Sequence, residues 1–253
     1  MIISRKKFLK IAGISALVAT GEKLGDSFSE AGEAPGTETQ QRLAMVIDLR
    51  KCAREKGCTQ CIDACHQAHN VPEIEDKNHK IQWIWKDEFK HAFPSTHGSY
   101  LAKKVEELPV LLLCNHCDNP PCVRVCPTKA TWKRENDGIV VMDWHRCIGC
   151  RYCMAACPYG SRSFNWKDPR PDIDDVNVDF PTRTKGVVEK CNFCDERRVD
   201  KLLPACVEAC PQNAMLFGDL NEAGSEIRQL LASEFSIRRK PELGTNPEVY
   251  YIV

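Results

Sequence analysis

The sequence has no excess of either charge, because 35 basic side chains balance 35 acidic ones over 253 residues. It therefore lacks the basic arm or stripe that binds nucleic acid or a membrane surface. Beyond the N-terminus the longest apolar run is LPVLLLC at 108–114, well short of the ~20 residues that span a bilayer. The remaining composition is that of an ordinary globular protein.

Several motifs of enzymes and redox proteins are also missing. The chain contains no G-x-G-x-x-G, no P-loop and no G-x-S-x-G, so it offers no dinucleotide fingerprint, phosphate cradle or hydrolase nucleophile elbow. It contains no C-x-x-C-H, the nearest sequence being CIDACH at 61–66, and this excludes a covalently attached c-type haem.

Cysteine, in contrast, is abundant. The 16 cysteines fall into four runs of four, at 52–65, 114–126, 147–157 and 191–210. The third run has the spacing C-x2-C-x2-C-x3-C-P, in which three thiolates surround one [4Fe–4S] cluster and the fourth binds a second cluster. The second run widens one gap to four residues and the fourth inserts eleven residues between its two pairs. The first run has five residues in its first gap and His66 in place of the proline.

Three kinds of sulfur chemistry compete for these runs. Disulfides suit an exported chain, but bridged cysteines rarely cluster at spacings of two and three. Structural zinc uses two C-x-x-C pairs. Repeated runs that end in Cys-Pro favour iron–sulfur clusters, and 16 thiols suffice for four [4Fe–4S] clusters. Cys52 could be a spare thiol, although a looser loop can still bring it to the first cluster.

An internal repeat predicts the fold. Each run follows a strand-like apolar segment, and Asp137-Gly138 between the second and third runs is a hairpin signal. Only this linker, 127–146, is a bare hairpin, so the second and third runs should share one module and the first and fourth another. We predict an α+β fold of two nested bacterial-ferredoxin-like modules with long loops. The expected parts are a signal and linker (1–40), an outer module (41–75 and 185–220), an insertion (76–107), an inner module (108–170) and a C-terminal extension (221–253).

Ferredoxin-type crossover of the fourth cysteine then assigns the ligands. The expected sets are Cys52, Cys58, Cys61 and Cys210 for cluster 1; Cys114, Cys117, Cys122 and Cys157 for cluster 2; Cys147, Cys150, Cys153 and Cys126 for cluster 3; and Cys191, Cys194, Cys206 and Cys65 for cluster 4. Four histidines near the runs are interpreted as hydrogen-bonding neighbours rather than ligands: His66, His69, His116 and His145. In the insertion, IQWIWKDEF alternates like a strand, so Trp83 and Trp85 could pack in the core or face a partner.

The N-terminus resembles an export leader. A basic start precedes a short apolar stretch from Ile11 to Ala19, which is typical of a signal peptide. SRKKFLK resembles the twin-arginine motif, with Arg5-Lys6 in place of two arginines. An amphipathic helix that caps the domain is the alternative. An uncleaved leader would tether the protein to the membrane.

The cysteine runs, above all LCNHCDNPPCVRVCPTKATWKRENDGIVVMDWHRCIGCRYCMAACPYGSRSFNW at 113–166, resemble the four-cluster electron-transfer subunits of membrane oxidoreductases. That family includes subunits of polysulfide reductase, formate dehydrogenase, nitrite reductase and periplasmic hydrogenases. Within it, CAREKGCTQCIDACHQAHNVP, IQWIWKDEF and FPTRTKGVVEKCNFC most resemble the DsrO subfamily. DsrO is the periplasmic iron–sulfur subunit of the Dsr membrane complex of sulfate reducers and sulfur oxidisers. The resemblance implies a polytopic NrfD-type membrane subunit that interacts with quinone, a multihaem cytochrome c and further subunits as partners.

We therefore expect an electron-transfer subunit without a substrate site of its own, located at the periplasmic face of the membrane and linked to sulfur or sulfite metabolism. Four cysteines for each cluster leave no open iron for a substrate, whereas catalytic iron–sulfur enzymes usually leave one iron without a cysteine. The alternatives are the corresponding subunit of another complex of the family and, from a different class, a structural zinc protein.

Overall fold

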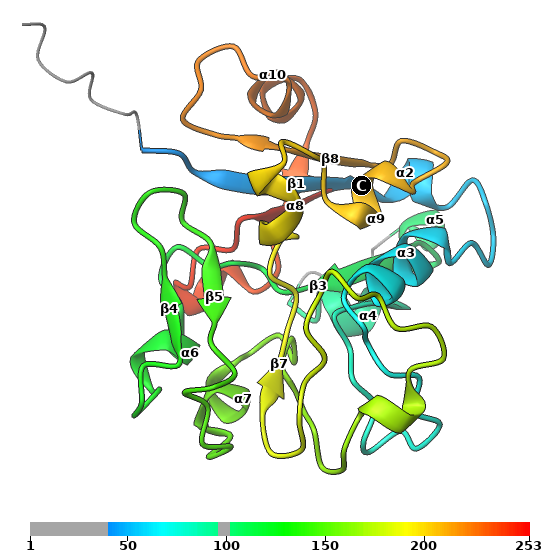
Figure 1. The fold of residues 1–253 in the computed structure, drawn as a ribbon. Helices are drawn as coiled ribbons and strands as arrows, with labels where there is room; N and C mark the ends of the chain where they lie inside the picture. Colours follow the sequence, from blue (N-terminus) through cyan, green and yellow to red (C-terminus); the bar gives the residue numbers. More distant parts are fainter. Residues whose placement is uncertain (1–39, 96–101) are drawn as a thin grey trace, which may run out of the picture. The chain divides into compact units, whose positions relative to one another are not determined.

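The computed structural model describes residues 40–95 and 102–253. The expected leader, with Arg5 and Lys6, lies outside the described residues. Gln40–Val253 form one compact unit, in which short helices and mostly antiparallel strands alternate (Figure 1). This mixture agrees with the expected α+β class. Within the described residues no helix has the length and apolar character needed to cross a membrane.

A four-stranded sheet joins distant parts of the chain. Its order is β8-β1-β10-β9, where β1 is Leu43–Asp48, β8 Met215–Asp219, β9 Ser236–Ile237 and β10 Val249–Ile252. Strand β1 pairs antiparallel with β8 and parallel with β10. Residues 221–253, expected as an extension, thus contribute two strands to the same sheet as the segment that precedes the first cysteine run.

The two faces of β1 enter two different cores. Met45 and Ile47 belong to the large core that also contains Cys61 and Cys65 of the first run and Cys191 and Cys206 of the fourth. Ala44 and Val46 point the other way and pack with Ile227 of α10 (Glu226–Ser233). Helix α10 covers the sheet on the side away from the cysteine runs (Figure 1). The period of two along β1 explains why all six of its residues are buried.

The other described strands form three two-stranded sheets. Their bounds are Ile84–Glu88 (β2) with Pro109–Leu113 (β3), Thr131–Lys133 (β4) with Val140–Met142 (β5), and Ser163–Phe164 (β6) with Val188–Glu189 (β7). The β4–β5 hairpin turns at Gly138, whose φ of +76° suits glycine, so the hairpin signal at Asp137-Gly138 is confirmed. Trp83, just before β2, is fully buried, and Trp85 is half-buried. Core packing is therefore the role of Trp83.

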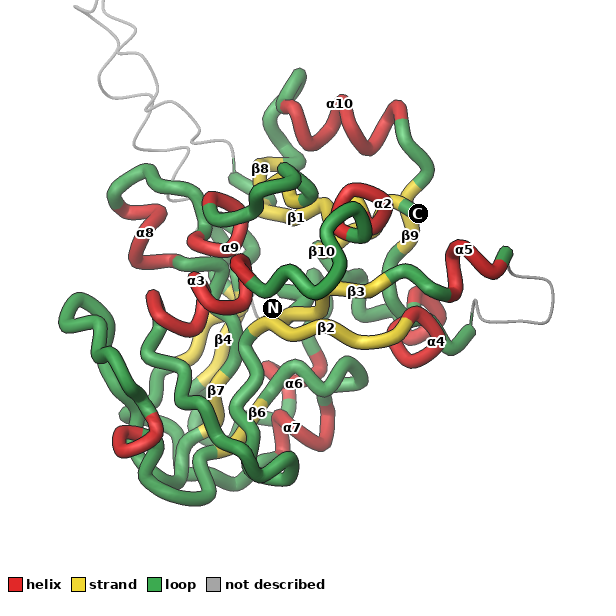
Figure 2. Tube along the Cα trace, turned by 90° about the vertical axis from the view of Figure 1, so that its right-hand side faces the viewer, coloured by secondary structure: helices red, strands yellow, loops and turns green. Residues whose placement is uncertain are grey.

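The helices near the cysteine runs are short. They are α2 Leu49–Cys52, α3 Gln60–Ala68, α6 Pro121–Arg124, α7 Tyr152–Ala156, α8 Asp195–Val199 and α9 Ala205–Glu208. Helix α3 of the first run packs against α9 of the fourth, and α6 of the second packs against α7 of the third (Figure 2). The remaining helices are α4 Phe89–Ala92 and α5 Lys103–Glu106, with 3-10 turns at Arg170–Asp172 and Pro241–Leu243.

Candidate metal centres

The structure brings three sets of four thiols around three small cavities. Site 1 consists of Cys52, Cys58, Cys61 and Cys210 around about 370 Å³. Site 2 consists of Cys114, Cys117, Cys122 and Cys157 around about 340 Å³. Site 3 consists of Cys126, Cys147, Cys150 and Cys153 around about 300 Å³. The same four-thiol lining, repeated at all three cavities, indicates sites for three groups of the same kind.

The remaining four cysteines form site 4, which consists of Cys65, Cys191, Cys194 and Cys206. All four are buried, between 3% and 7% exposed. Burial, followed by the charges of the other three thiols, raises the pKa of Cys65 well above its usual value. Sites 1 to 3 thus bring together the cysteines that the sequence groups for clusters 1 to 3, and the assignment of all 16 as cluster ligands stays a prediction.

Short helices distribute the cysteines between neighbouring sites. In α3, Cys61 faces site 1 and Cys65, one turn later, faces site 4; in the fourth run, Cys206 of α9 belongs to site 4 and Cys210 to site 1. Sites 2 and 3 are linked in the same way: Cys122 and Cys157 belong to site 2, whereas Cys126 and Cys153 belong to site 3. Side chains four residues apart lie on the same helix face, so one turn of helix sets the separation between two sites.

Three C-x-x-C pairs share a tight turn. The residue before the second cysteine has a left-handed φ in each: His116 (+42°), Gly149 (+67°) and Phe193 (+59°). Only glycine adopts this conformation without steric cost. At Gly149 an added Cβ would also lie 2.4 Å from the carbonyl oxygen of Gly186. The loop around site 3 therefore requires glycine at this position.

Gly149→Ala should destabilise site 3, and Gly160→Ala is the matched control. Both glycines have a φ of +67°, but a Cβ on Gly160 would meet nothing within 4 Å. The clash should cost Gly149→Ala about 1–3 kcal/mol more than the control, or about 2–4 °C per kcal/mol in anaerobic thermal melting. Equal melting temperatures of the two variants would show that the loop can move away from Gly186.

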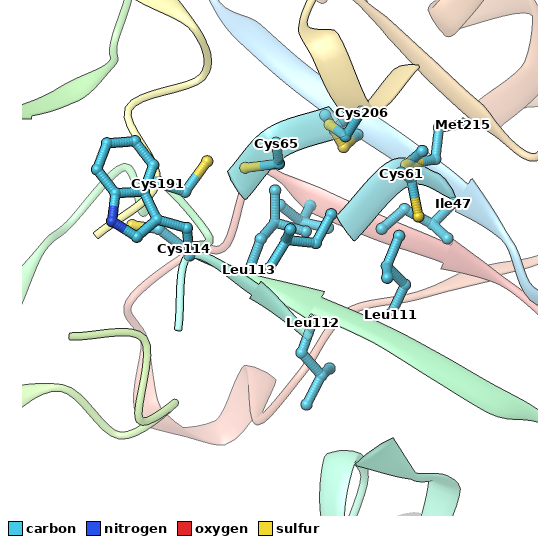
Figure 3. Close-up of a cluster of buried hydrophobic side chains, with 14 of the residues drawn as sticks. Ile47, Cys61, Cys65, Leu111, Leu112, Leu113, Cys114, Cys191, Cys206 and Met215 are labelled. Carbon is cyan, nitrogen blue, oxygen red and sulfur yellow. The ribbon is translucent and has the colours of Figure 1, made fainter. Parts of the chain in front are cut away.

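The four sites follow one another in a row. The pKa of Cys206 is raised mainly by burial and then by the thiols of Cys194, Cys191 and Cys61. Because Cys61 belongs to site 1, sites 1 and 4 are neighbours. Burial and then Cys114 of site 2 raise the pKa of Cys191. Cys122 of site 2 likewise contributes to the raised pKa of Cys153, whose main cause is burial. These influences link site 1 to site 4, site 4 to site 2 and site 2 to site 3, and Figure 3 shows the first part of this row from Cys61 through Cys206 and Cys65 to Cys191 and Cys114.

The ends of this row are more exposed than its middle. At site 1 three of the four cysteines are half-buried, as are three of the four at site 3, whereas site 4 is closed. Two apolar side chains on either side of Cys150 stand out from the surface at site 3: Ile148 is 65% exposed and Tyr152 61%. The row thus begins and ends near solvent.

The donor set fits iron–sulfur clusters. Burial raises the pKa of several thiols, with Cys61 and Cys117 at about 12, so these side chains would hold their protons unless a metal displaced them. Apolar side chains line the cavity at site 1, where Ile47, Leu111 and Met215 lie beneath the sulfurs. Backbone N–H groups point at three sulfurs: Phe193 at Cys191 (3.4 Å), Ala205 at Cys194 (3.3 Å) and Ala214 at Cys210 (3.3 Å). Such bonds stabilise thiolate ligands and tune the potential of a cluster.

The histidines differ in their relation to the sites. His69 is buried beside site 4, with Nδ1 3.7 Å from Cys65 Sγ and Nε2 2.8 Å from Glu196 Oε1. His116 stacks on Phe193 at 3.7 Å between ring centroids and accepts a hydrogen bond from Val140 N–H. His66 is half-buried on α3. The side chain of His145 is 99% exposed, so it is not a neighbour of any site among the described residues, contrary to expectation.

Sequence reasoning missed the buried cations. Arg162 and Lys190 are 4% and 2% exposed. Arg162 Nη2 donates to Cys122 Sγ at 3.1 Å, and Lys190 Nζ donates to the carbonyl of Cys191 at 2.7 Å. Arg183 is also buried and pairs with Glu189 at 2.7 Å. The sequence offers only one sign of these buried cations, namely that Arg162 and Lys190 stand close to cysteine runs. Exposed basic residues can stand equally close to such runs, so this position does not predict burial.

Two family matches agree with this geometry. Residues 108–171 match a 4Fe-4S dicluster domain family, and residues 146–214 match a second family of the same description. The first match spans the second and third cysteine runs, and the second spans the third and fourth. The expected cofactor class, [4Fe–4S] clusters, is therefore confirmed.

Full-length relatives decide the family. The chain is 39% identical to Hdr-like menaquinol oxidoreductase iron-sulfur subunit 1 of Archaeoglobus fulgidus over 271 aligned positions, which cover 99% of this chain and 98% of the relative. This chain belongs to the family of iron–sulfur electron-transfer subunits of oxidoreductase complexes. It is also similar to the menaquinone reductase iron-sulfur cluster-binding subunit of Nitratidesulfovibrio vulgaris (38% identity, 85% of this chain and 90% of the relative). NrfC of Escherichia coli is 34% identical, with 100% of this chain and 96% of the relative covered.

Members of this iron–sulfur subunit family transfer electrons within enzyme complexes rather than carrying the catalytic site. The general expectation of an electron-transfer subunit is thus confirmed. The comparisons do not single out the DsrO subfamily, since relatives from several complexes match at similar identity.

Proposed function

We propose that the chain binds four [4Fe–4S] clusters, one at each of sites 1 to 4, and relays single electrons along the row 1-4-2-3. A cluster with four thiolate ligands accepts and releases one electron at a time and has no open iron for a substrate. The chain holds the thiolates, keeps water away from sites 4 and 2, and directs N–H groups at the sulfurs. The contrast between exposed ends and a buried middle carries this proposal, because electrons must enter and leave at the ends.

The nested pairing supports the same assignment. Helix α3 contributes Cys61 to site 1 and Cys65 to site 4, and the fourth run contributes Cys206 of α9 to site 4 and Cys210, just beyond α9, to site 1, so the first and fourth runs act as one outer module. The second and third runs do the same for the inner module, through α6 and α7 and the cysteines that follow these helices. A row of neighbouring sites suits electron transfer, whose rate falls steeply with distance.

The partners we propose are a polytopic NrfD-type membrane subunit that handles quinol and, at the other end, a multihaem cytochrome c or another redox subunit. Relatives that are named menaquinol oxidoreductase and menaquinone reductase subunits support a link to quinone. The motifs of the first run and of 180–194 favour a DsrO-type subunit in sulfur or sulfite metabolism. The corresponding iron–sulfur subunit of a nitrite, polysulfide, formate or hydrogen-oxidising complex is the alternative.

We further propose a location at the periplasmic face of the membrane, peripheral or tethered by an uncleaved leader. The basic start and short apolar stretch support export. Added protease should digest the protein in spheroplasts without cell lysis. Protection of the protein until lysis would contradict export.

Gentle detergent extraction from native membranes tests the partner. The protein should co-purify with a polytopic subunit, and added quinol should reduce its clusters in the isolated complex. A protein that comes away as a soluble monomer and turns over a substrate alone would contradict the proposal.

Ile148→Asp should weaken this association if site 3 faces a partner, because a charge at the centre of an apolar contact is costly to desolvate. We expect at least about tenfold less partner in the purified complex, the usual cost of losing a contact at the centre of an interface. Phe235→Asp is the matched control, since Phe235 is 74% exposed but lies next to β9, away from α7 (Figure 2). If both variants lost the same amount of partner, or if Ile148→Asp lost none, site 3 would not be the end of the row that docks to the partner.

A further inference from the structure

Arg162 places a buried guanidinium directly on site 2. Its Nη2 donates to Cys122 Sγ at 3.1 Å and to Thr131 Oγ1 at 2.9 Å, and Nη1 lies 3.4 Å from Met142 Sδ. Arg162 also lines the cavity that the four site 2 cysteines surround. The contact with Cys122 is thus a charge-assisted hydrogen bond to a metal ligand, not a contact at the rim.

No carboxylate in the described part of the chain forms an ion pair with this guanidinium. Arg183, an equally buried arginine, pairs with Glu189 at 2.7 Å, which shows how the fold neutralises a buried cation elsewhere. The side chains with the largest electrostatic effect on Arg162 are the thiols of Cys122, Cys153 and Cys114. Its positive charge is therefore balanced by site 2 and, to a smaller extent, by site 3.

Arg162 also acts on Cys153 of site 3, but sites 1 and 4 have no equivalent contact. At site 1 the half-buried Lys86 donates to the carbonyl of Cys58 rather than to a sulfur. At site 4, Lys190 Nζ donates to the carbonyls of Val140 and Cys191. Within the described residues, Arg162 is the one arginine or lysine that donates a hydrogen bond to a cysteine sulfur.

We propose that Arg162 is a positioning residue that raises the reduction potential of the cluster at site 2. This inference rests on the proposed binding of a [4Fe–4S] cluster there. Reduction adds one negative charge to a site that excludes water, and a fixed cation at hydrogen-bond distance stabilises the reduced form more than the oxidised form. The guanidinium keeps its charge at every physiological pH. Arg162 thereby favours the arrival of an electron in the middle of the row.

Potentiometric titration of the anaerobically purified protein, followed by electron paramagnetic resonance, tests this role. Arg162→Gln should weaken electron binding at one cluster by about tenfold or more, a downward shift of about 59 mV for one electron. The shifted signal should be the signal that Cys122→Ala removes. Arg162→Lys, which keeps the charge, should show less than half of the shift. Arg170→Gln, at an exposed arginine paired with Asp168, should show none.

Iron content separates the outcomes. A wild-type protein without reducible clusters would overturn the proposed function itself. A fully loaded Arg162→Gln variant with unchanged potentials, or with a shift in a signal other than that of site 2, would overturn this inference alone. If the Arg162→Gln variant loses iron, the Thr131→Val variant is titrated instead. This substitution removes the hydroxyl that holds Arg162 Nη2 beside Cys122. That variant should also lower the potential of site 2, and unchanged potentials there would equally contradict the role.

Discussion

Removal of iron from the purified protein should abolish the cooperative unfolding transition of residues 40–253. A small core beside sites 2 and 3 has four buried residues, of which Cys122 and Cys153 are two; the others are Val140 and, from β7, Val188. Without metal, the thiols of this core are left around an unfilled cavity. In small metal-dependent domains the metal contributes on the order of 10 kcal/mol to folding, which is comparable to the whole net stability of a folded domain, about 5–15 kcal/mol.

Anaerobic chelation followed by thermal melting and near-ultraviolet circular dichroism provides the measurement. We expect a steep transition in the loaded protein and none after chelation. Reconstitution with iron and sulfide should restore the transition, which controls for irreversible damage. An apoprotein that still melts cooperatively near the temperature of the loaded protein would show that the clusters are not part of the core.

Pairs of cysteine variants should lose clusters in a pattern that reveals the nesting. Cys61→Ala and Cys210→Ala should remove one and the same spectroscopic signal, because both residues belong to site 1. Cys65→Ala and Cys206→Ala should remove a different one, that of site 4. Each variant should lose up to about four iron atoms, since a [4Fe–4S] cluster with three thiolates is labile.

The variants at site 4 should also nearly abolish electron transfer through the row, because the loss leaves a gap between site 1 and site 2. The rate of cluster reduction by quinol in the isolated complex measures this effect. A consecutive grouping, in which each run binds its own cluster, predicts instead that Cys61→Ala and Cys65→Ala lose the same signal. That result would overturn the crossover between runs.

Local patterns made much of the fold predictable. The apolar segments before the cysteine runs form β1, β3, β5 and β7, and Asp137-Gly138 forms the turn of the β4–β5 hairpin. These signals depend on short apolar runs and on one glycine, so they can be read without knowledge of distant residues. The cysteine spacing acts over the same short range, because one helical turn separates Cys61 from Cys65.

Features that depend on distant contacts were not predictable. The parallel pairing of β1 with β10 joins Met45 to Val249, and nothing in either segment specifies the other. The environment of Arg162 was equally hidden, because its burial depends on Thr131 and Met142 of another hairpin. His145 shows the opposite error: proximity in sequence to Cys147 did not bring its side chain to a site.

The central claim, a row of four clusters in one chain, is tested most directly by counting iron and electrons in the anaerobically purified protein. The account predicts about sixteen iron and about sixteen acid-labile sulfide per chain, and reductive titration should show about four one-electron equivalents. Zinc in place of iron, or a fully loaded protein that accepts only about two electrons, would contradict it.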